Sequence, residues 1–184
     1  MRGKLVILSG PSGVGKDTVI DAWNERDPRV KRVVAYTTRD PRPGEIPDED
    51  YHFVTVEKFK NLADSGAFLE WKEVHGNFYA TPLHDMEAML KNGKIAILKI
   101  DVQGALVAKE KRPDALMIFL LPPSMEELED RIRGRAQDSP EVIEKRLKNA
   151  RGEMEYASQY DFQVVNDDLE RCVQEIMDIV AKSA

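Results

Sequence analysis

The chain has 184 residues, of which 42% are hydrophobic and 33% charged, so it is long enough for one hydrophobic core. A formal net charge of −6 argues against a nucleic-acid binder, because such proteins usually present a net basic face. No apolar run approaches the roughly 20 residues of a membrane-spanning helix, and no signal-peptide apolar region is present. The single cysteine, Cys172, excludes an internal disulfide. We therefore expect a cytoplasmic protein that binds neither nucleic acid nor membrane.

Short apolar segments alternate with amphipathic ones along most of the chain. Buried strands are predicted at residues 4–8, 30–36, 94–100, 116–121 and 162–165. Helices are predicted to begin near Thr18, Val102, Ser124, Pro140 and Asp167, the last of these acting as an N-cap. Strands that alternate with helices predict an α/β fold of three layers, in which helices cover both faces of a central parallel sheet.

Two segments, 37–81 and 126–150, interrupt this alternation. We expect both to be insertions within a single domain that covers residues 1–184. Residues 37–81 combine a charged, proline-rich loop, a short helix started by Thr55, and a strand pair, 68–74 and 77–80, that turns near Gly76. Thr81 and Pro82 have the residue types of an N-cap and a first helical position, so they are predicted to open the next helix. Insertions of this kind can carry a second substrate and a closing lid. The predicted division is a core of 1–36, 82–125 and 151–184, a substrate-binding segment of 37–81, and a lid of 126–150.

A glycine-rich loop follows the first predicted strand and leads into the first predicted helix. Residues 10–16 match the phosphate-binding pattern G-x-x-x-x-G-K in full. Glycines let backbone N–H groups point inward around a phosphate, the helix N-terminus adds positive potential, and the lysine reaches the outer phosphates. The loop therefore predicts ATP binding by Gly10, Pro11, Ser12, Gly13, Val14, Gly15, Lys16, Asp17 and Thr18.

Asp17 stands where this pattern normally has serine or threonine, whose hydroxyl binds Mg²⁺. A carboxylate oxygen is also a good Mg²⁺ ligand, although it adds a negative charge beside the nucleotide phosphates. We therefore expect Asp17 to hold Mg²⁺, directly or through water, and Thr18 to contact a nearer phosphate. Mg²⁺ would act as the cofactor that accompanies ATP.

Five further sequence blocks follow the glycine loop in a fixed order. They are TTRDPRPGE at 37–45, DYHF at 50–53, FLEW at 68–71, GNFYAT at 76–81 and IDVQG at 100–104. With the loop, the arginine-rich segment 131–135 and residues 165–168, they resemble the guanylate kinase family along the whole chain. This resemblance implies a P-loop nucleoside monophosphate kinase whose substrates are ATP and GMP and whose products are ADP and GDP.

The resemblance also implies roles for individual residues. It places the GMP site at Arg39, Arg42, Tyr51, Glu70, Tyr79, Thr81 and Asp101, and it adds Asn166 to the ATP site. Arg39 and Arg42 would clamp the monophosphate, since guanidinium groups bind phosphate in bidentate fashion. Glu70 would accept hydrogen bonds from N1–H and the 2-amino group of guanine and would repel the N1 acceptor of adenine.

Phosphoryl transfer needs in-line positioning and charge stabilisation more than covalent help from the protein. The phosphate of GMP is already anionic, so no general base is required. Lys16 would hold the outer phosphates of ATP, Arg39 would orient the acceptor, and lid arginines would neutralise the transition state. The predicted catalytic residues are Lys16, Arg39, Arg131, Arg135 and Arg146.

The sequence departs from the family pattern at further positions near these residues. Ala35 and Tyr36 replace a pair that often contains serine, Ala80 stands where glycine is usual, and Lys99 replaces a common acidic residue. These changes alter the hydrogen-bonding groups expected around GMP and the metal, but the arginine pair and Glu70 remain.

Two other functions were weighed against GMP phosphorylation. The first is a kinase of another phosphorylated substrate such as ribose 1,5-bisphosphate, since some of these also carry Asp after the loop lysine. The presence of Arg42, Gly44–Glu45 and Glu70 argues against it, because a sugar needs no carboxylate that reads guanine. The second is a non-catalytic module that binds proteins through a guanylate-kinase-like domain. Such modules typically lose the loop lysine, whereas Lys16 is present here.

Overall fold

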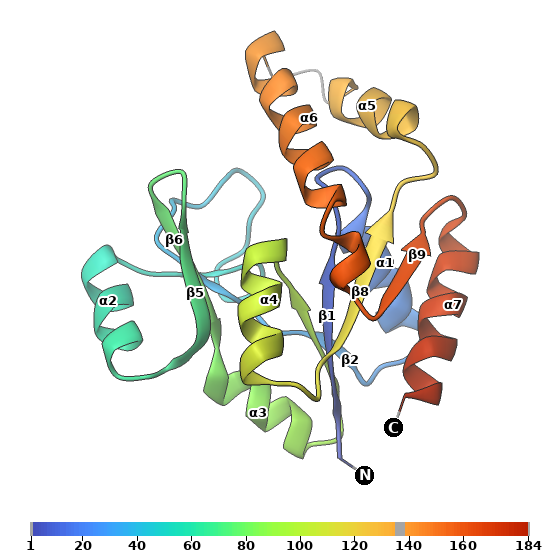
Figure 1. Ribbon diagram of the computed structural model, residues 1–184. Helices are drawn as coiled ribbons and strands as arrows, with labels where there is room; N and C mark the ends of the chain where they lie inside the picture. Colours follow the sequence, from blue (N-terminus) through green and yellow to red (C-terminus); the bar gives the residue numbers. More distant parts are fainter. Residues whose placement is uncertain (1, 135–138, 184) are drawn as a thin grey trace.

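A five-stranded parallel sheet forms the centre of the computed structural model, which describes residues 2–134 and 139–183 (Figure 1). Its strands are β1 (Lys4–Ser9), β2 (Val30–Arg32), β7 (Ile95–Lys99), β8 (Leu116–Leu121) and β9 (Phe162–Val165). They lie in the order β2-β7-β1-β8-β9, and every pairing between neighbours is parallel. The predicted α/β class with a parallel central sheet is confirmed.

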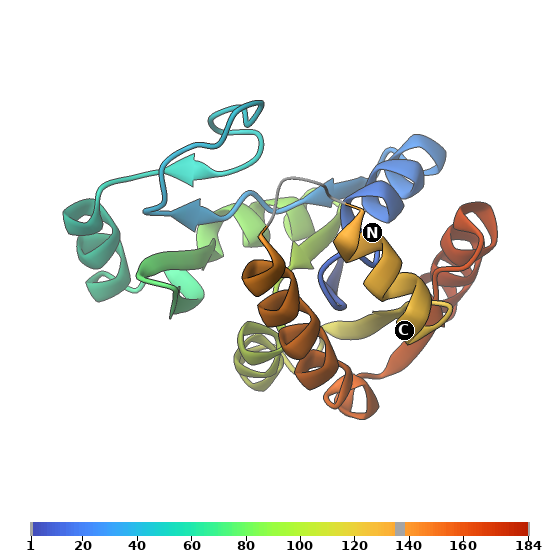
Figure 2. The same cartoon turned by 90° about the horizontal axis from the view of Figure 1, so that it is seen from above.

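Helices cover both faces of this sheet, so the core has three layers (Figure 2). One face packs against α1 (Lys16–Arg26) and α7 (Leu169–Lys182), and the other against α3 (Leu83–Lys91) and α4 (Val102–Lys111). Successive strand residues point to opposite faces. In β1, Val6 and Leu8 enter the first apolar cluster and Leu5 and Ile7 the second. Within the described residues, no helix combines the length and the apolar character needed to cross a membrane.

A second sheet of four short strands stands beside the core. It is built from β3 (Tyr36–Thr37), β4 (His52–Phe53), β5 (Phe68–Val74) and β6 (Asn77–Pro82), in the order β4-β3-β6-β5. Helix α2 (Val56–Asp64) packs on it through the buried Phe59, and the Thr55 hydroxyl caps this helix as predicted. The predicted pair of strands is confirmed as the β5–β6 hairpin, whose turn residues His75 and Gly76 both have positive φ.

A pair of helices rises beyond the carboxyl ends of the central strands (Figure 1). They are α5 (Met125–Arg133), capped by Ser124, and α6 (Pro140–Met154), capped by Ser139. A short 3-10 helix, η1 (Ala157–Gln159), then leads to β9. The two helices share a small apolar cluster of their own, formed by Leu128, Ile132, Leu147 and Ala150.

The single strand predicted over Val30–Tyr36 is wrong. Strand β2 ends at Arg32, and after the Val33 N–H has bonded to the Ile97 carbonyl the chain leaves the central sheet. Tyr36 already belongs to the second sheet, where it pairs with strands β4 and β6. The apolar pattern runs through both short strands, so it does not reveal the point where the chain changes sheets.

Two predicted helix starts are also wrong. Thr81 lies within β6 opposite Glu70, to which its hydroxyl donates a hydrogen bond, so Pro82 takes the N-cap position of α3. Helix α7 is capped by Asp168 instead of Asp167, whose carboxylate is engaged by an arginine side chain. In both cases the side chain that was predicted to cap the helix is hydrogen-bonded elsewhere, Thr81 to Glu70 and Asp167 to Arg171.

We predict that Ile97→Ala lowers the free energy of unfolding by about 2–5 kcal/mol, because it deletes buried methyl groups at the centre of the sheet. Ile97 is 0% exposed and belongs to the apolar cluster under α1 and α7. Urea denaturation measures the change. The matched control is Val107→Ala on α4, where the side chain is 42% exposed and the expected change stays within about 0.5 kcal/mol. An equal loss in both variants would contradict this account of the core.

Candidate active site

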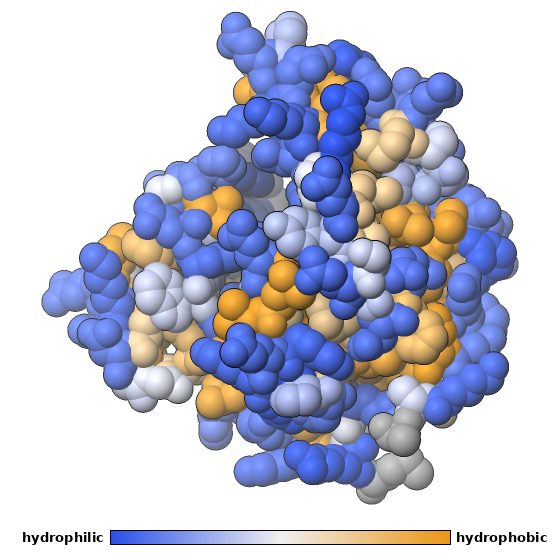
Figure 3. Space-filling model, in the orientation of Figure 1, coloured by the Kyte–Doolittle hydropathy of each residue, from blue (hydrophilic) through white to orange (hydrophobic). Residues whose placement is uncertain are grey.

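The chemically distinctive residues gather at the carboxyl ends of β1 and β7. The glycine loop follows β1, and Asp101 follows β7 after Ile100. Strand β1 lies between β7 and β8, and ligands of open α/β sheets bind at the carboxyl edge where the strand order reverses. In Figure 3 the mostly hydrophilic surface is hollowed between the part that carries β5 and β6 and the part that carries α6.

The glycine loop has the backbone of a phosphate cradle. Gly13 and Gly15 adopt left-handed φ angles of 86° and 96°, which residues other than glycine rarely adopt. Val14 is fully buried between them and anchors the loop in the core, and its N–H donates to the Pro11 carbonyl at 3.2 Å. Gly15 is the N-cap of α1, so the helix starts at Lys16, two residues before the predicted Thr18.

The Lys16 side chain is directed back toward the glycine loop. Its Nζ donates to the Gly10 carbonyl at 2.6 Å. Burial lowers the pKa of Lys16 to about 8, against an opposing effect of Glu153 from α6. An ammonium group with so low a pKa is poorly solvated and favours an anionic ligand.

Asn166 supports the loop from the end of β9. Its side-chain Nδ2 donates to the Val14 carbonyl at 2.8 Å, and its backbone N–H donates to the Leu121 carbonyl at 2.8 Å. A Cβ on Gly15 would lie only 3.0 Å from this Nδ2, so the loop and the amide are closely fitted. The structure therefore places Asn166 against the backbone of the loop.

The arginine block forms a small polar cavity of about 380 Å³ beside the loop. Arg39 makes a two-pronged ion pair with Glu45, at 2.7 and 2.9 Å, and its guanidinium lies 5.2 Å from the centre of the Tyr51 ring. The Arg42 N–H also donates to Glu45 at 2.7 Å, and the Tyr79 ring lies 6.1 Å from that of Tyr51. The four predicted clamp residues thus lie close together, and two of them, Arg39 and Arg42, bind the Glu45 carboxylate.

Glu45 is a site residue to which the sequence assigned no role. Its hydrogen bonds with Arg39 lower the pKa of the Glu45 carboxyl to about 2, and they raise the pKa of Arg39. The carboxylate therefore stays ionised and fixes the orientation of the guanidinium. Its position six residues after Arg39, across the turn at Gly44, is the signal that could have identified it.

A second cavity, of about 300 Å³, adjoins the first and contains Glu70. Glu70 is only 4% exposed, and its Oε1 accepts a 2.8 Å hydrogen bond from the Thr81 hydroxyl across the β5–β6 pair. Its Oε2 is buried and has no hydrogen-bond partner among the described residues. Burial raises the pKa of the Glu70 carboxyl, while Thr81 and nearby lysines oppose this shift. A buried carboxylate oxygen without a partner is costly and indicates a ligand that donates to it.

Asp101 and Lys72 complete this cavity. Asp101 is the N-cap of α4, where its Oδ1 accepts from the Gly104 N–H at 2.9 Å, and it also forms an ion pair with Lys72. Lys72 lies two residues after Glu70 on β5, so both side chains point to the same face of the strand. Burial lowers the pKa of Lys72. Lys72 was not among the predicted site residues, although its spacing from Glu70 on a predicted strand was a usable signal.

Asp17, the predicted metal ligand, is engaged by two cations. Its Oδ1 accepts from Lys99 Nζ at 2.8 Å and from an Arg32 Nη at 2.7 Å. Burial would raise the pKa of Asp17, but the two cations outweigh this and the net shift is downward. The side chain is 61% exposed, and no hydrogen bond from a described residue reaches Oδ2. Mg²⁺ bound to a nucleotide often uses one or two carboxylates plus phosphates and water, so a single ionised carboxylate fits. The described residues contain no cluster of three acidic, histidine or cysteine side chains that would hold a metal without the nucleotide.

The predicted lid lies over the glycine loop. A Cβ on Gly13 would be 3.3 Å from Ile132 and 3.6 Å from Leu128, so α5 packs directly on the loop. Arg131 is partly exposed and lies 3.4 Å from Glu127, while Arg146 is half-buried on α6. Arg135 lies outside the described residues. Glu153, also missed by the sequence analysis, brings a carboxylate of α6 near Lys16.

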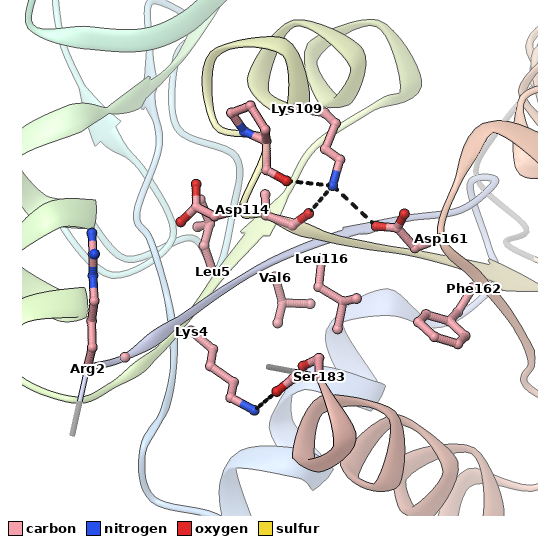
Figure 4. Close-up of a pocket in the computed structure, with 13 residues that line it drawn as sticks. Arg2, Lys4, Leu5, Val6, Lys109, Asp114, Leu116, Asp161, Phe162 and Ser183 are labelled. Carbon is pink, nitrogen blue, oxygen red and sulfur yellow. Dashed lines mark hydrogen bonds and ion pairs between the residues drawn. The ribbon is translucent and has the colours of Figure 1, made fainter.

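A larger cavity, of about 660 Å³, lies at the opposite, amino end of the sheet (Figure 4). Its lysines are already satisfied: Lys109 donates to the Pro113 and Ala115 carbonyls and pairs with Asp161, and Lys4 donates to carbonyls at the end of α7. The glycine loop and Glu70 do not line it. It is therefore a poorer candidate for the active site than the two smaller cavities.

We predict that ATP binding takes up a substantial fraction of a proton near pH 8. Lys16 is about half deprotonated there, because burial lowers its pKa to about 8, and the bound phosphates would favour the ammonium form. The affinity for ATP should therefore fall as the pH rises above this value. Calorimetry in buffers of different ionisation enthalpy measures the uptake. In Lys16→Arg the side chain stays protonated and the uptake should vanish; an undiminished uptake would exclude Lys16 as its source.

Comparison with known proteins agrees with this geometry. The sequence model of the guanylate kinase family matches residues 2–183. The chain is 47% identical to guanylate kinase of Aromatoleum aromaticum over 183 residues, covering 100% of this chain and 90% of the relative. It is 49% identical to guanylate kinase of Mesorhizobium japonicum over 180 residues, covering 97% and 83%.

Solved structures give the same result. The crystal structure of guanylate kinase from Anaplasma phagocytophilum superposes with a TM-score of 0.80 at 35% identity, covering 99% of this chain and 87% of that one. The SH3-kinase fragment of tight junction protein 3, at 11% identity and a TM-score of 0.53, shares the fold alone; it covers 98% of this chain and 57% of the fragment. With a family match along nearly its whole length, the chain belongs to the guanylate kinase family.

Proposed function

We propose that this chain transfers the γ-phosphoryl group of ATP to GMP and releases ADP and GDP. The observation that carries this function is the buried Glu70, whose Oε2 lacks a partner among the described residues and which lies in a cavity that adjoins the arginine cavity. The two cavities share Tyr51 and Lys99 in their walls, so one ligand can place its base beside Glu70 and its phosphate beside Arg39.

Glu70 is the residue that selects guanine. Guanine presents two donors side by side, N1–H and the 2-amino group, and an ionised carboxylate can accept both. Thr81 holds Oε1 and thereby fixes the plane of the carboxylate, while Oε2 lies near Gly104. Adenine presents an acceptor at N1, which would leave the buried carboxylate without a donor and is strongly disfavoured.

Arg39, Arg42, Tyr51 and Tyr79 bind the phosphate of GMP. The arginine cavity is lined by cations and carboxylates in equal number, so a bound phosphate has to replace carboxylate contacts. Glu45 holds Arg39 in a fixed orientation, which reduces the entropy lost when the guanidinium meets a phosphate. Arg42 contributes its side chain while its backbone N–H remains tied to Glu45.

On the ATP side, the loop residues 10–18 surround the phosphates and Lys16 lies at the β- and γ-phosphates. Mg²⁺ bound with ATP would neutralise phosphate charge, and Asp17 is the residue that fits it. Arg131, Arg146 and Arg135, the last outside the described residues, are assigned to the lid, 126–150, and segment 37–81 carries most of the GMP site. The acceptor is already an anion, so the protein only has to align it and stabilise the transferred charge.

The two alternative functions are not favoured. A kinase of a sugar bisphosphate has no use for a buried carboxylate next to the phosphate cavity, whereas Glu70 supplies one. A protein-binding module has no use for the loop lysine, whereas Lys16 is held across a phosphate cradle. Relatives at 47–49% identity carry the name guanylate kinase.

The proposed activity predicts ADP release from Mg·ATP with GMP as acceptor, and none with AMP, UMP, CMP or ribose 1,5-bisphosphate. In Arg39→Ala the KM for GMP should rise about ten- to hundredfold, because a charge-assisted hydrogen-bonding group is lost, while the KM for ATP stays nearly unchanged. A coupled assay measures both. Arg29→Ala is the matched control, since Arg29 is exposed and pairs only with Asp27 among the described residues. Turnover only with the sugar bisphosphate, or equal loss for both substrates in Arg39→Ala, would contradict the assignment.

A second prediction concerns the space around Glu70. In Gly104→Ala the new Cβ would lie 2.9 Å from Glu70 Oε2, so the carboxylate must move. We expect the KM for GMP to rise about tenfold, which corresponds to about 1.4 kcal/mol of lost binding, with little change for ATP. Gly152→Ala in α6 is the matched control, because a Cβ there meets no described atom within 4 Å. An unchanged KM for GMP in Gly104→Ala would show that Glu70 does not contact the base.

A further inference from the structure

Lys99 connects the central sheet to both candidate substrate cavities. It is the last residue of β7 and pairs in register with Leu8, next to the start of the glycine loop. Its Nζ lies 2.8 Å from Asp17 Oδ1, and an Arg32 Nη lies 2.7 Å from the same oxygen. One carboxylate oxygen therefore accepts from two cations.

Lys99 lies in the walls of both candidate substrate cavities, a position that a purely structural lysine does not need. Its side chain is 24% exposed, and it lines the arginine cavity together with Arg39 and Arg42. It also lines the cavity of Glu70. A GMP molecule with its base beside Glu70 and its phosphate beside Arg39 would extend past Lys99, which lines both cavities.

The contact with Asp17 is one that a phosphate can replace. Asp17 is well exposed, and an ion pair with an exposed partner is only weakly stabilising. Arg32 compensates the charge of Asp17 independently. A phosphate carries more charge and more acceptor oxygens than a carboxylate, and a lysine ammonium can turn any of its three N–H groups toward it.

We propose that Lys99 is an additional ligand of the GMP phosphate, held by Asp17 beside the arginine cavity and transferred from the carboxylate to the phosphate when GMP binds. The proposal rests on the proposed function, because it assumes that GMP occupies the two cavities. It makes Asp17 a competitor of the GMP phosphate for Lys99. The alternative role for Lys99 is only to neutralise Asp17, which would otherwise repel the phosphate.

Binding measurements without ATP and without Mg²⁺ separate these roles, since they remove any contribution of Asp17 to the metal. Calorimetry would give the affinities of the whole chain for GMP and for guanosine, which lacks the phosphate. The variants are Lys99→Met, Lys99→Arg, Asp17→Asn and the double variant Asp17→Asn/Lys99→Met. Lys109→Met is the control, because Lys109 also pairs with an aspartate but lies in the cavity at the far end of the sheet. Thermal melting checks that each variant is folded.

If Lys99 binds the phosphate, Lys99→Met weakens GMP binding about ten- to hundredfold and leaves guanosine binding unchanged. Asp17→Asn tightens GMP binding, because the competing carboxylate is gone. Lys99→Met still weakens GMP binding when it is introduced into Asp17→Asn. Lys99→Arg, which keeps the charge, retains most of the affinity, and Lys109→Met behaves as the unsubstituted chain.

Three results would overturn the proposal. If Lys99→Met has no effect in the Asp17→Asn background, Lys99 only neutralises Asp17. If it weakens guanosine as much as GMP, Lys99 supports the base cavity and not the phosphate. If the unsubstituted chain binds neither GMP nor guanosine, the proposed function itself is wrong, and this outcome is recognised before any variant is compared.

Discussion

The parallel pairing of β1 with both β7 and β8 is the constraint on which the site depends. In this register Leu8 lies opposite Lys99 on one side and Ile118 on the other, so the glycine loop emerges beside the residues that follow β7. A shift of one residue would exchange the two faces of a buried strand, and the core residues would no longer face their helices. The apolar side chains that fix the register therefore also fix the distance between the phosphate cradle and Asp101.

The same site shows how an acidic protein pairs several of its cations with carboxylates. Arg39 pairs with Glu45, Lys99 with Asp17, and Lys72 with Asp101. A buried or half-buried charge is costly unless it is paired, so these carboxylates permit the cations to be present before a phosphate arrives. They also select among ligands, because an anion can replace a carboxylate only if it carries more charge or fits the cation better.

The sequence predicted those parts of the structure whose causes are local. The glycine loop, the β5–β6 turn and the caps at Thr55 and Ser124 each depend on a few adjacent residues, and the structure has all of them. The strand over 30–36 and the cap at Thr81 failed because contacts with distant segments decided them. Pairing with β6 drew Tyr36 into the second sheet, and Glu70 engaged the Thr81 hydroxyl.

The candidate site divides in the same way. The family blocks indicated the residues that would contact a ligand, such as Arg39 and Glu70, but not the groups that hold them. Spacing gave a usable signal for Glu45 and Lys72, which lie close in sequence to Arg39 and Glu70. Glu153 owes its place to the fold, since it comes from α6 and its charge acts on Lys16 of the glycine loop. Its partner could not be read from spacing, because a charged residue on a helix has many possible neighbours.

The helix pair α5–α6 bears on how such a site can both admit a substrate and exclude water. Its apolar cluster is separate from the two clusters of the core, to which α6 is joined at its end by Met154. Yet it contacts the glycine loop, through Leu128 and Ile132 over Gly13. Glu153 from the same pair also acts on Lys16. A change in charge at the loop, such as the arrival of nucleotide phosphates, therefore changes the forces on the helix pair directly.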